Sequence, residues 1–291
     1  MATARVPRSD STKRQNRTWY QLRTNPAFVF GAGVLTLMTI GAIWGQVAPP
    51  YDPVAQDFSN RLNPPSLTHV LGTDRFGRDI FSRLLAGTAP MLLVAAGATL
   101  LASALGIPIG IVSSAAGRYG AVISRLLDGF QAFPGLVLSL LLVIIFGASY
   151  GAIVLAAGLA FFPLVARVTE AVVDSESARE YVQAAEAMGM RRVWILLLHI
   201  LPNGASALIV QATTIFSLSI LVEASLSFLG LGPQTLTPTW GRIVFDARST
   251  MELAPHTILA PLAAISSLVV SVNLLGDALR DALDPIVSSV R

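Results

Sequence analysis

One polar stretch between two long apolar runs carries the side chains best suited to chemistry, and the chemistry they suit is recognition of another protein. It runs from Glu180 to Asn203 and reads EYVQAAEAMGMRRVWILLLHILPN. Its carboxylate, amide and guanidinium groups can form ion pairs and hydrogen bonds, and its alanines allow another surface to come close. The loop has no pattern of residues that would bind a small molecule or a metal ion. A structured loop of this length is then best explained by a protein partner that binds it.

Start and stop signals predict a short helix over residues 178–188. Ser177 is followed three residues later by Glu180, which is the spacing of a capping box. Gly189 can adopt the left-handed conformation that ends a helix, and Pro202 interrupts the apolar segment that follows. The sequence therefore predicts a separate docking helix at this point of the chain.

The predicted helix combines an apolar face with flanking charge. The apolar face suits a groove on a partner, and its residues are Tyr181, Val182, Ala185 and Met188. Arg191 and Arg192 can meet either acids on the partner or anionic lipid headgroups, and the sequence leaves both open. The full set of predicted coupling residues is Glu180, Tyr181, Val182, Gln183, Ala184, Ala185, Met188, Gly189, Arg191 and Arg192.

The sequence lacks the motifs of nucleotide-binding and zinc-hydrolase sites. It contains no GxxxxGK phosphate loop followed by Ser or Thr and no HExxH, so a partner must carry out any ATP hydrolysis. The 3 histidines are scattered and there is no cysteine, which argues against a metal site or a disulfide framework. We expect no catalytic residue, metal site or cofactor in this chain.

Composition indicates an all-α integral membrane protein. Of the 291 residues, 53% are hydrophobic and 13% are charged, and the mean hydropathy is +0.65. The charged share is about half that of a soluble domain. Six apolar runs are long enough to cross a bilayer, with a break expected in the third near Pro134. They cover residues 27–48, 90–115, 122–146, 152–173, 204–229 and 255–276.

The basic residues orient these spans. A cytoplasmic N-terminus places 14 of the 20 Lys and Arg on the cytoplasmic side, as the positive-inside rule favours. Because they lie at the ends of apolar runs, the pI of about 9.7 reflects membrane orientation and not nucleic-acid binding. The predicted parts are a cytoplasmic basic tail (1–25), a first span (26–48), an external loop (49–89) and a five-helix core (90–291) that includes the cytoplasmic loop 174–203.

The two longer external segments carry patterns of their own. From Leu71 the chain reads LGTDRFGRDIFSRLLAG, with opposite charges four residues apart, such as Asp74 and Arg78. This pattern predicts an amphipathic helix at the interface that sets the angle of the second span. The Gly and Pro residues of segment 230–254 predict a compact loop, with Trp240 at the membrane interface.

Polar side chains within the spans are costly unless they face a cavity or a partner. Gln131, Gln211 and Glu223 are therefore candidates for pathway or interhelical polar residues. A carboxylate in a span can also act in a proton relay, but we find no chain of acids with a basic partner at helical spacing. For Glu223 the pattern favours an interhelical hydrogen bond.

The cytoplasmic loop resembles the EAA loop of permease subunits of bacterial ABC importers, whose pattern is EAA, three residues, Gly, nine residues and IxLP. The residues on this spacing are Ala184, Ala185, Gly189, Leu201 and Pro202. Gln183 stands where the pattern has Glu, and His199 where it has Ile. Three further stretches make the chain similar to the C-type permease of dipeptide, oligopeptide and nickel importers: HVLGTDRFGRDIFSRLL, EASLSFLGLG with TPTWGR downstream, and NLLGDALRDALDP.

The resemblance implies the six-helix type I importer architecture, in the bacterial cytoplasmic (inner) membrane with cytoplasmic N- and C-termini. It implies a second similar permease, ATP-binding subunits (separate or fused) that hold ATP and Mg, and an extracytoplasmic binding protein that delivers solute. The helix over 178–188 would then be a coupling helix. Peptides or similar small solutes are the expected cargo, although no residue singles out one solute.

Two other classes of protein remain as alternatives. A self-contained secondary transporter or channel needs a site within one chain, usually built from inverted repeats with broken helices. We find no convincing repeat between the two halves of the sequence. A membrane scaffold would explain the docking helix but not the polar residues within the spans. An adjacent gene for a phosphate-loop ATPase, or solute movement by the pure chain, would discriminate among the three.

Overall fold

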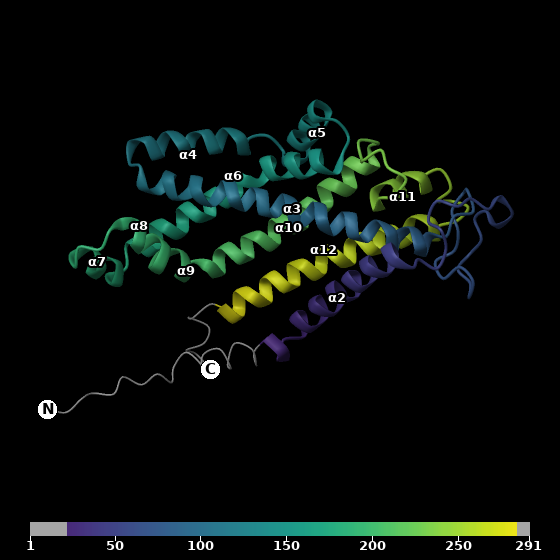
Figure 1. The fold of residues 1–291 in the computed structure, drawn as a ribbon, viewed down its shortest axis with the longest axis horizontal. Coiled ribbons are helices and arrows are strands. Elements are labelled where there is room, and N and C mark those ends of the chain that lie inside the picture. Colours follow the sequence, from purple (N-terminus) through teal and green to yellow (C-terminus); the bar gives the residue numbers. More distant parts are fainter. Residues whose placement is uncertain (1–21, 284–291) are drawn as a thin grey trace.

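Long apolar helices lie side by side along the molecule, and short helices lie at its ends (Figure 1). The computed structural model describes residues 22–283. The long helices are α2 (Pro26–Val47), α3 (Ile80–Ala115), α6 (Tyr150–Ser177), α10 (Ala205–Phe228) and α12 (His256–Leu283), with α4 (Arg118–Gln131) and α5 (Gly135–Phe146) between α3 and α6. The short segments are η1 (Phe58–Asn60), α7 (Glu180–Ala187), α8 (Arg192–Ile195), η2 (Leu196–Ile200), α9 (Leu201–Asn203) and α11 (Trp240–Ala247).

Side-chain caps start three of the long helices by satisfying backbone N–H groups that have no partner within the helix. The Asp79 carboxylate accepts a hydrogen bond of 2.7 Å from the backbone N–H of Ser82 at the start of α3. Ser149 Oγ accepts one of 3.1 Å from the N–H of Ala152 at the start of α6. Asn25 caps α2 in the same way.

The six-span fold class is confirmed. Five helices in the described part of the chain are long and apolar enough to cross a membrane, and the bent pair α4–α5 brings the number to six. The two helices of this pair meet at 84°, at the point where Pro134 was expected to interrupt the third span. Of the predicted basic tail, residues 1–21 lie outside the described residues, as do both chain ends.

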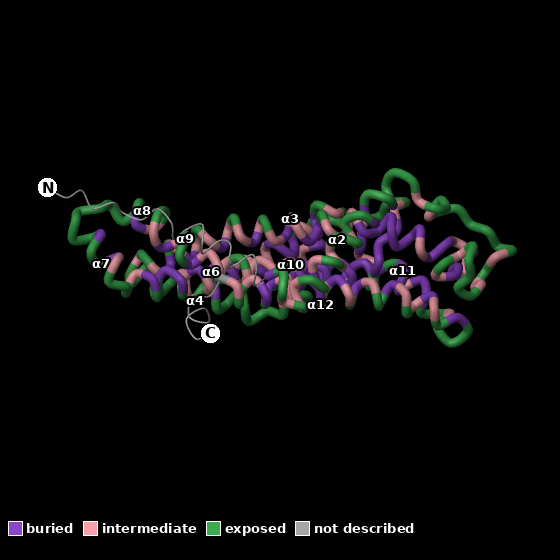
Figure 2. Tube along the Cα trace, turned by 90° about the horizontal axis from the view of Figure 1, so that it is seen from below, coloured by how far each residue is buried: buried purple, intermediate pink, exposed green. Residues whose placement is uncertain are grey.

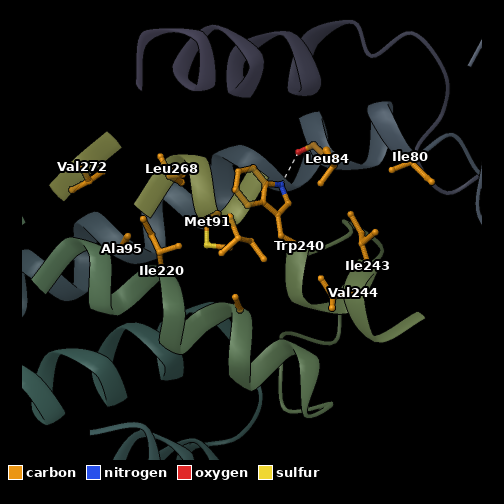
Figure 3. Close-up of a cluster of buried hydrophobic side chains, with 12 residues drawn as sticks. Ile80, Leu84, Met91, Ala95, Ile220, Trp240, Ile243, Val244, Leu268 and Val272 are labelled. Carbon is orange, nitrogen blue, oxygen red and sulfur yellow. Dashed lines mark hydrogen bonds between the residues drawn. The ribbon is translucent and has the colours of Figure 1, made fainter. Parts of the chain in front are cut away.

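Two clusters of buried apolar side chains hold the helices together. The first joins α3, α10, α11 and α12 around Trp240, whose indole N–H donates a hydrogen bond of 2.9 Å to the carbonyl oxygen of Leu84 (Figure 3). The second joins α3, α5, α6 and α10 around Phe161 and Ile215. Burial of this apolar surface fixes the relative positions of the helices that carry the sites described below.

The segment 230–254 contains a helix that the sequence did not predict. Residues 240–247 form α11, which starts where the Thr239 hydroxyl caps the N–H of Arg242. Trp240 is 1% exposed in the core, so its predicted position at the membrane interface is wrong. A helix of this length has too few turns to show a hydrophobic periodicity in the sequence, and the Gly- and Pro-rich segments beside it indicate a loop.

The separate amphipathic helix predicted from Leu71 is also wrong. Residues 71–79 form turns, and α3 begins only at Ile80, so one continuous helix carries the second span. Gly77 has a φ of +74°, and a Cβ at this position would lie 1.7 Å from the carbonyl oxygen of Asp57. Only glycine fits such a close turn. The charges of this segment therefore have helical spacing in the sequence but do not lie on a helix.

The short elements gather at opposite ends of the molecule. Figure 1 shows α7, α8 and α9 at one end and α11 at the other, beside the segment between α2 and α3. In Figure 2 the surface around α7 is largely exposed, with a few buried positions facing the rest of the chain. The molecule therefore has two distinct ends built from short elements, and long apolar helices separate them.

Candidate functional site

The short helix predicted over residues 178–188 is present as α7, Glu180–Ala187. Its N-cap is Arg179, and no side chain caps it. Ser177 instead belongs to the last turn of α6, so the capping box predicted with Glu180 is wrong. The chain passes from α6 to α7 through only two residues, which ties the orientation of α7 to the end of a spanning helix.

The predicted stop at Gly189 is confirmed. Gly189 has a φ of +79°, its N–H donates to the carbonyl oxygen of Glu186 at 2.9 Å, and the N–H of Met190 donates to that of Ala185 at 3.1 Å. These two bonds are those of a Schellman motif, which closes a helix with a left-handed residue. The helix therefore ends sharply and turns the chain back toward α8.

The apolar face expected to contact a partner is largely used within the chain. Val182 and Ala185 are buried, and they pack in a cluster with Val173, Ile195 and Ile200. Such burial makes these two residues anchors of α7, because a partner cannot contact a side chain that is already enclosed. The prediction that they lie on a docking face is corrected accordingly.

Tyr181 connects α7 to both neighbouring segments. Its hydroxyl donates a hydrogen bond of 2.5 Å to the carboxylate of Glu176, and it accepts one of 3.2 Å from the side-chain amide of Asn203. Partial burial, and then the bond to Glu176, raises the pKa of Tyr181 above its usual value. The phenol therefore stays protonated at neutral pH and keeps its role as a donor.

The remaining predicted coupling residues lie on the outer surface of α7 and the turn after it. They are Glu180, Gln183, Ala184, Met188, Gly189, Arg191 and Arg192. Apolar side chains that the sequence analysis did not single out continue this surface over α8 and η2: Val193, Trp194, Leu197 and Leu198. Their signal in the sequence was the run WILLL, which is part of the apolar segment that Pro202 interrupts. We call these eleven residues the α7 surface.

The three polar residues predicted within the spans do not come together. Gln131 is exposed at the end of α4, whereas Gln211 lines a cavity of about 770 Å³ between α6, α7, α10 and α12. Glu223 is 1% exposed, and one of its oxygens accepts a hydrogen bond of 2.9 Å from Ser227 on the same helix. Its other oxygen has no hydrogen-bond partner among the described residues.

A further polar group that sequence reasoning missed ties α4 to α6. Arg167 pairs with Glu170 at 2.8 Å and with Asp128 of α4. Glu170 also accepts hydrogen bonds from Ser113 at 2.9 Å and from Ser124 at 2.5 Å. Arg167 and Asp128 lie 39 positions apart, so no local spacing in the sequence indicates that they pair.

No group of three or more His, Cys, Asp or Glu residues that could hold a metal ion occurs within residues 22–283. The arrangement on the α7 surface offers contact area and charge instead of a reaction centre. The buried cluster below α7 connects this surface to α6 through Val173.

Comparisons with known proteins identify the family. The model of the binding-protein-dependent transport system inner membrane component matches residues 102–289, and that of the N-terminal transmembrane domain of oligopeptide transport permease C matches residues 16–65. The dipeptide transport system permease protein DppC of Alkalihalophilus pseudofirmus is 37% identical, covering 92% of this chain and 89% of that protein. The glutathione transport system permease protein GsiD of Pectobacterium atrosepticum is 38% identical, covering 99% and 97% respectively.

Solved structures agree with the fold. A chain of the methionine ABC transporter MetNI in an inward-facing conformation superposes with a TM-score of 0.60 at 18% sequence identity, covering 69% of this chain and 96% of that one. Family members are multi-pass inner-membrane subunits that are not themselves the ATPase. The family match, the two relatives and the helical architecture together show that this chain belongs to the permease subunits of binding-protein-dependent ABC importers.

Proposed function

We propose that this permease forms half of the translocation pathway of an ATP-driven importer of peptides or similar small solutes, and that it couples to the ATPase through α7. The cargo class is taken from the relatives, which are named for dipeptide and glutathione transport. The second half of the pathway is a similar permease. ATP and Mg are bound by ATP-binding subunits, and an extracytoplasmic binding protein delivers the solute.

The observation that carries the coupling role is the two-sided character of α7. Its inner side is held by Val182 and Ala185 in the buried cluster, and its outer side is free to meet a partner. The helix has eight residues and is about 12 Å long, at 1.5 Å per residue. A groove on an ATP-binding subunit can accommodate a helix of this length.

Movement of the partner would pass through α7 as a rigid-body displacement. The buried cluster joins α7 to Val173 of α6 and Ile200 of η2, and the hydroxyl of Tyr181 bonds to Glu176 of α6. Since close-packed interiors do not deform continuously, a push on α7 shifts the end of α6 as a unit. ATP-driven closure of the partners would thereby switch the pathway between inward- and outward-open states.

The proposed orientation places α7 and both termini in the cytoplasm and α11 on the opposite side. The excess of Lys and Arg predicted for the cytoplasmic side supports this assignment. Within that frame, Gln211 is the better candidate for a pathway residue because it lines the cavity next to α7, whereas Gln131 is exposed at the end of α4.

Native mass spectrometry of the tagged full-length chain, extracted in mild detergent from its own host, tests this function. The proposal predicts recovery of the chain with one similar permease and with ATP-binding subunits. Recovery of the chain alone or as a homo-oligomer under several mild conditions would contradict it. That result would favour a self-contained secondary transporter, which solute movement by the pure chain in vesicles would then establish.

A further inference from the structure

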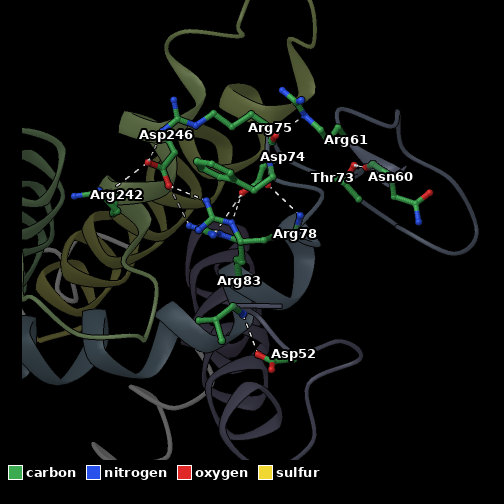
Figure 4. Close-up of polar contacts among 12 residues, drawn as sticks. Asp52, Asn60, Arg61, Thr73, Asp74, Arg75, Arg78, Arg83, Arg242 and Asp246 are labelled. Carbon is green, nitrogen blue, oxygen red and sulfur yellow. Dashed lines mark hydrogen bonds and ion pairs between the residues drawn. The ribbon is translucent and has the colours of Figure 1, made fainter. Parts of the chain in front are cut away.

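Four arginines converge at the end of the molecule opposite α7. Arg75 and Arg78 lie in the turns before α3, Arg83 lies in its first turns, and Arg242 lies on α11 (Figure 4). Two carboxylates face them. Asp74 pairs with Arg78 at 2.7 Å and with Arg83 at 3.4 Å. Asp246 of α11 pairs with Arg78 at 2.9 Å, with Arg83 at 3.4 Å, with Arg242 at 3.5 Å and with Arg75 at 3.6 Å.

This arginine cluster carries more positive charge than its own acids neutralise. Two carboxylates serve four guanidinium groups, so the charges within the cluster do not cancel. The surplus lies on the two more exposed arginines, since the side chains of Arg75 and Arg242 are 34% and 50% exposed, whereas that of Arg83 is 3% exposed. These two arginines are therefore accessible to an anion that enters from solvent.

Two donors in the cluster lack an acceptor. The Nε atoms of Arg75 and Arg83 are buried and have no hydrogen-bond partner among the described residues. Guanidinium Nε–H groups normally bond when buried, since an unpaired buried donor loses its hydration without compensation. A bound anion would supply acceptors for these donors and balance the surplus positive charge.

A cavity lies against these groups. It has a volume of about 430 Å³, and all four arginines of the cluster line it. The acid Asp246, the apolar residues Val54, Phe76 and Leu236, and neutral polar residues that include Gln56 and Gln234 also line it. This volume lies within the range of sites for small molecules, and it is open enough for a ligand to enter from the proposed outer side.

We propose that this cavity binds the carboxylate of a small solute at the mouth of the permease. A carboxylate matches the planar, bidentate geometry of guanidinium groups and supplies acceptors for donors that have none. The choice of a carboxylate-bearing solute rests on the proposed importer function, and it deepens that function by naming the chemical group that the permease recognises. The positive field of the cluster would also draw anionic solutes to the mouth.

Binding of paired probes to the full-length chain in lipid nanodiscs tests this site. N-acetylalanine carries the carboxylate, and N-acetylalanine amide has the same shape without the charge. Titration calorimetry at low ionic strength is expected to detect binding of the acid at least tenfold tighter than that of the amide, the order expected for a charge-assisted hydrogen bond. Equal binding of the two probes, or none, would overturn the proposal.

Two variants separate this cavity from general surface charge. Arg242→Gln removes a half-exposed member of the cluster and is expected to weaken binding of the acid about tenfold. Arg248→Gln is the matched control, because Arg248 is exposed just beyond α11 and does not line the cavity. Equal weakening by both variants would overturn the assignment to this cavity. Arg83→Gln removes the buried arginine of the cluster. If Arg83→Gln fails to fold, Arg242→Gln still tests the site.

The test also distinguishes failure of this site from failure of the importer function. Binding of the probes needs neither the second permease nor ATP, whereas recovery of ATP-binding subunits does not need the cavity. Loss of the acid-over-amide preference with normal recovery of the subunits would reject only the carboxylate site. Absence of the subunits, with the preference intact, would reject only the importer function.

Discussion

Val182 and Met188 lie on opposite sides of the short segment that carries α7, since Val182 is 1% exposed and Met188 is 78% exposed. The inner residue belongs to the buried cluster with Val173 and Ile195, and the outer one follows directly after α7. This relationship separates two roles that the sequence had assigned to one face. Changes on the inner side should act on folding, and changes on the outer side on docking.

A charge at the outer position should impair coupling without unfolding the chain. Met188→Glu places a carboxylate where an apolar contact with the ATP-binding subunit is proposed, and we expect solute-stimulated ATPase activity of the reconstituted complex to fall about tenfold. Leu253→Glu is the matched control, because Leu253 is 81% exposed near α11. Normal activity of Met188→Glu, or equal loss in both variants, would contradict docking through this surface.

A large side chain at the inner position should act through stability instead. Ala185 is buried in the cluster below α7, so Ala185→Trp overpacks it and should cost about 1–3 kcal/mol. We expect local opening of α7, measured as faster cleavage by trypsin at Arg179 and Arg191. Ala184→Trp serves as the control, since Ala184 is exposed. Equal cleavage rates in both variants would show that Ala185 is not an anchor.

The turn after α7 gives a conformational test. Gly189 has a φ of +79°, and a Cβ there would meet no atom within 4 Å, so only backbone strain opposes substitution. Gly189→Val should cost about 1–2 kcal/mol and lower coupled ATPase activity, whereas Gly189→Asn should retain most of it because Asn tolerates the left-handed region. Equal loss in both variants would point to a requirement for the bare glycine surface.

The outer cluster should depend strongly on its shared acid. Asp246→Asn removes the charge that faces four arginines and leaves buried Arg83 short of a counter-charge, so we expect a loss of about 3 kcal/mol in the free energy of unfolding. Thermal unfolding in detergent measures the change. Glu252→Gln, at an exposed position close in sequence, should leave the unfolding temperature unchanged. A similar temperature for both variants would contradict the structural role of Asp246.

Glu223 should serve packing and not the solute pathway. Glu223→Gln keeps an oxygen that can accept the hydrogen bond from Ser227, so assembly and transport should be retained. Glu223→Ala leaves the Ser227 hydroxyl without that acceptor beside a new void, which should cost about 1–3 kcal/mol. Recovery of the complex measures assembly. Normal assembly of Glu223→Gln with altered solute selectivity would instead place Glu223 in the pathway.

The spanning helices were predictable from the sequence because membrane spans depend on length and apolar composition alone. The predicted runs agree with the helices to within a few residues, except that α3 begins at Ile80 and not near Pro90, and α12 continues to Leu283 and not to residue 276. The break near Pro134 was predictable for a local reason, because Pro134 cannot donate the helical hydrogen bond and Gly135 follows it directly. Its angle of 84° was not predictable, because it depends on packing of α4 and α5 against α6.

The remaining differences come from contacts between distant parts of the chain. Arg78 and Asp74 have the spacing of a helical ion pair, yet they lie in the turns before α3. There Asp74 also pairs with Arg83 of α3, and Arg78 also pairs with Asp246 of α11. On α7, the sequence showed which residues are apolar but not which side meets the rest of the chain. That side is fixed by Val173 and Ile200, which lie in other segments.

Site-directed crosslinking tests the central claim, docking of the ATP-binding subunit on the α7 surface, most directly. The chain has no cysteine, so Met188→Cys introduces a single thiol. In the assembled complex, a short thiol-reactive photocrosslinker at residue 188 should join the permease to the ATP-binding subunit, with a yield that changes when ATP is added. The same reagent on Leu253→Cys should give no such product. Absence of the crosslink at residue 188, or an equal yield at residue 253, would contradict the account.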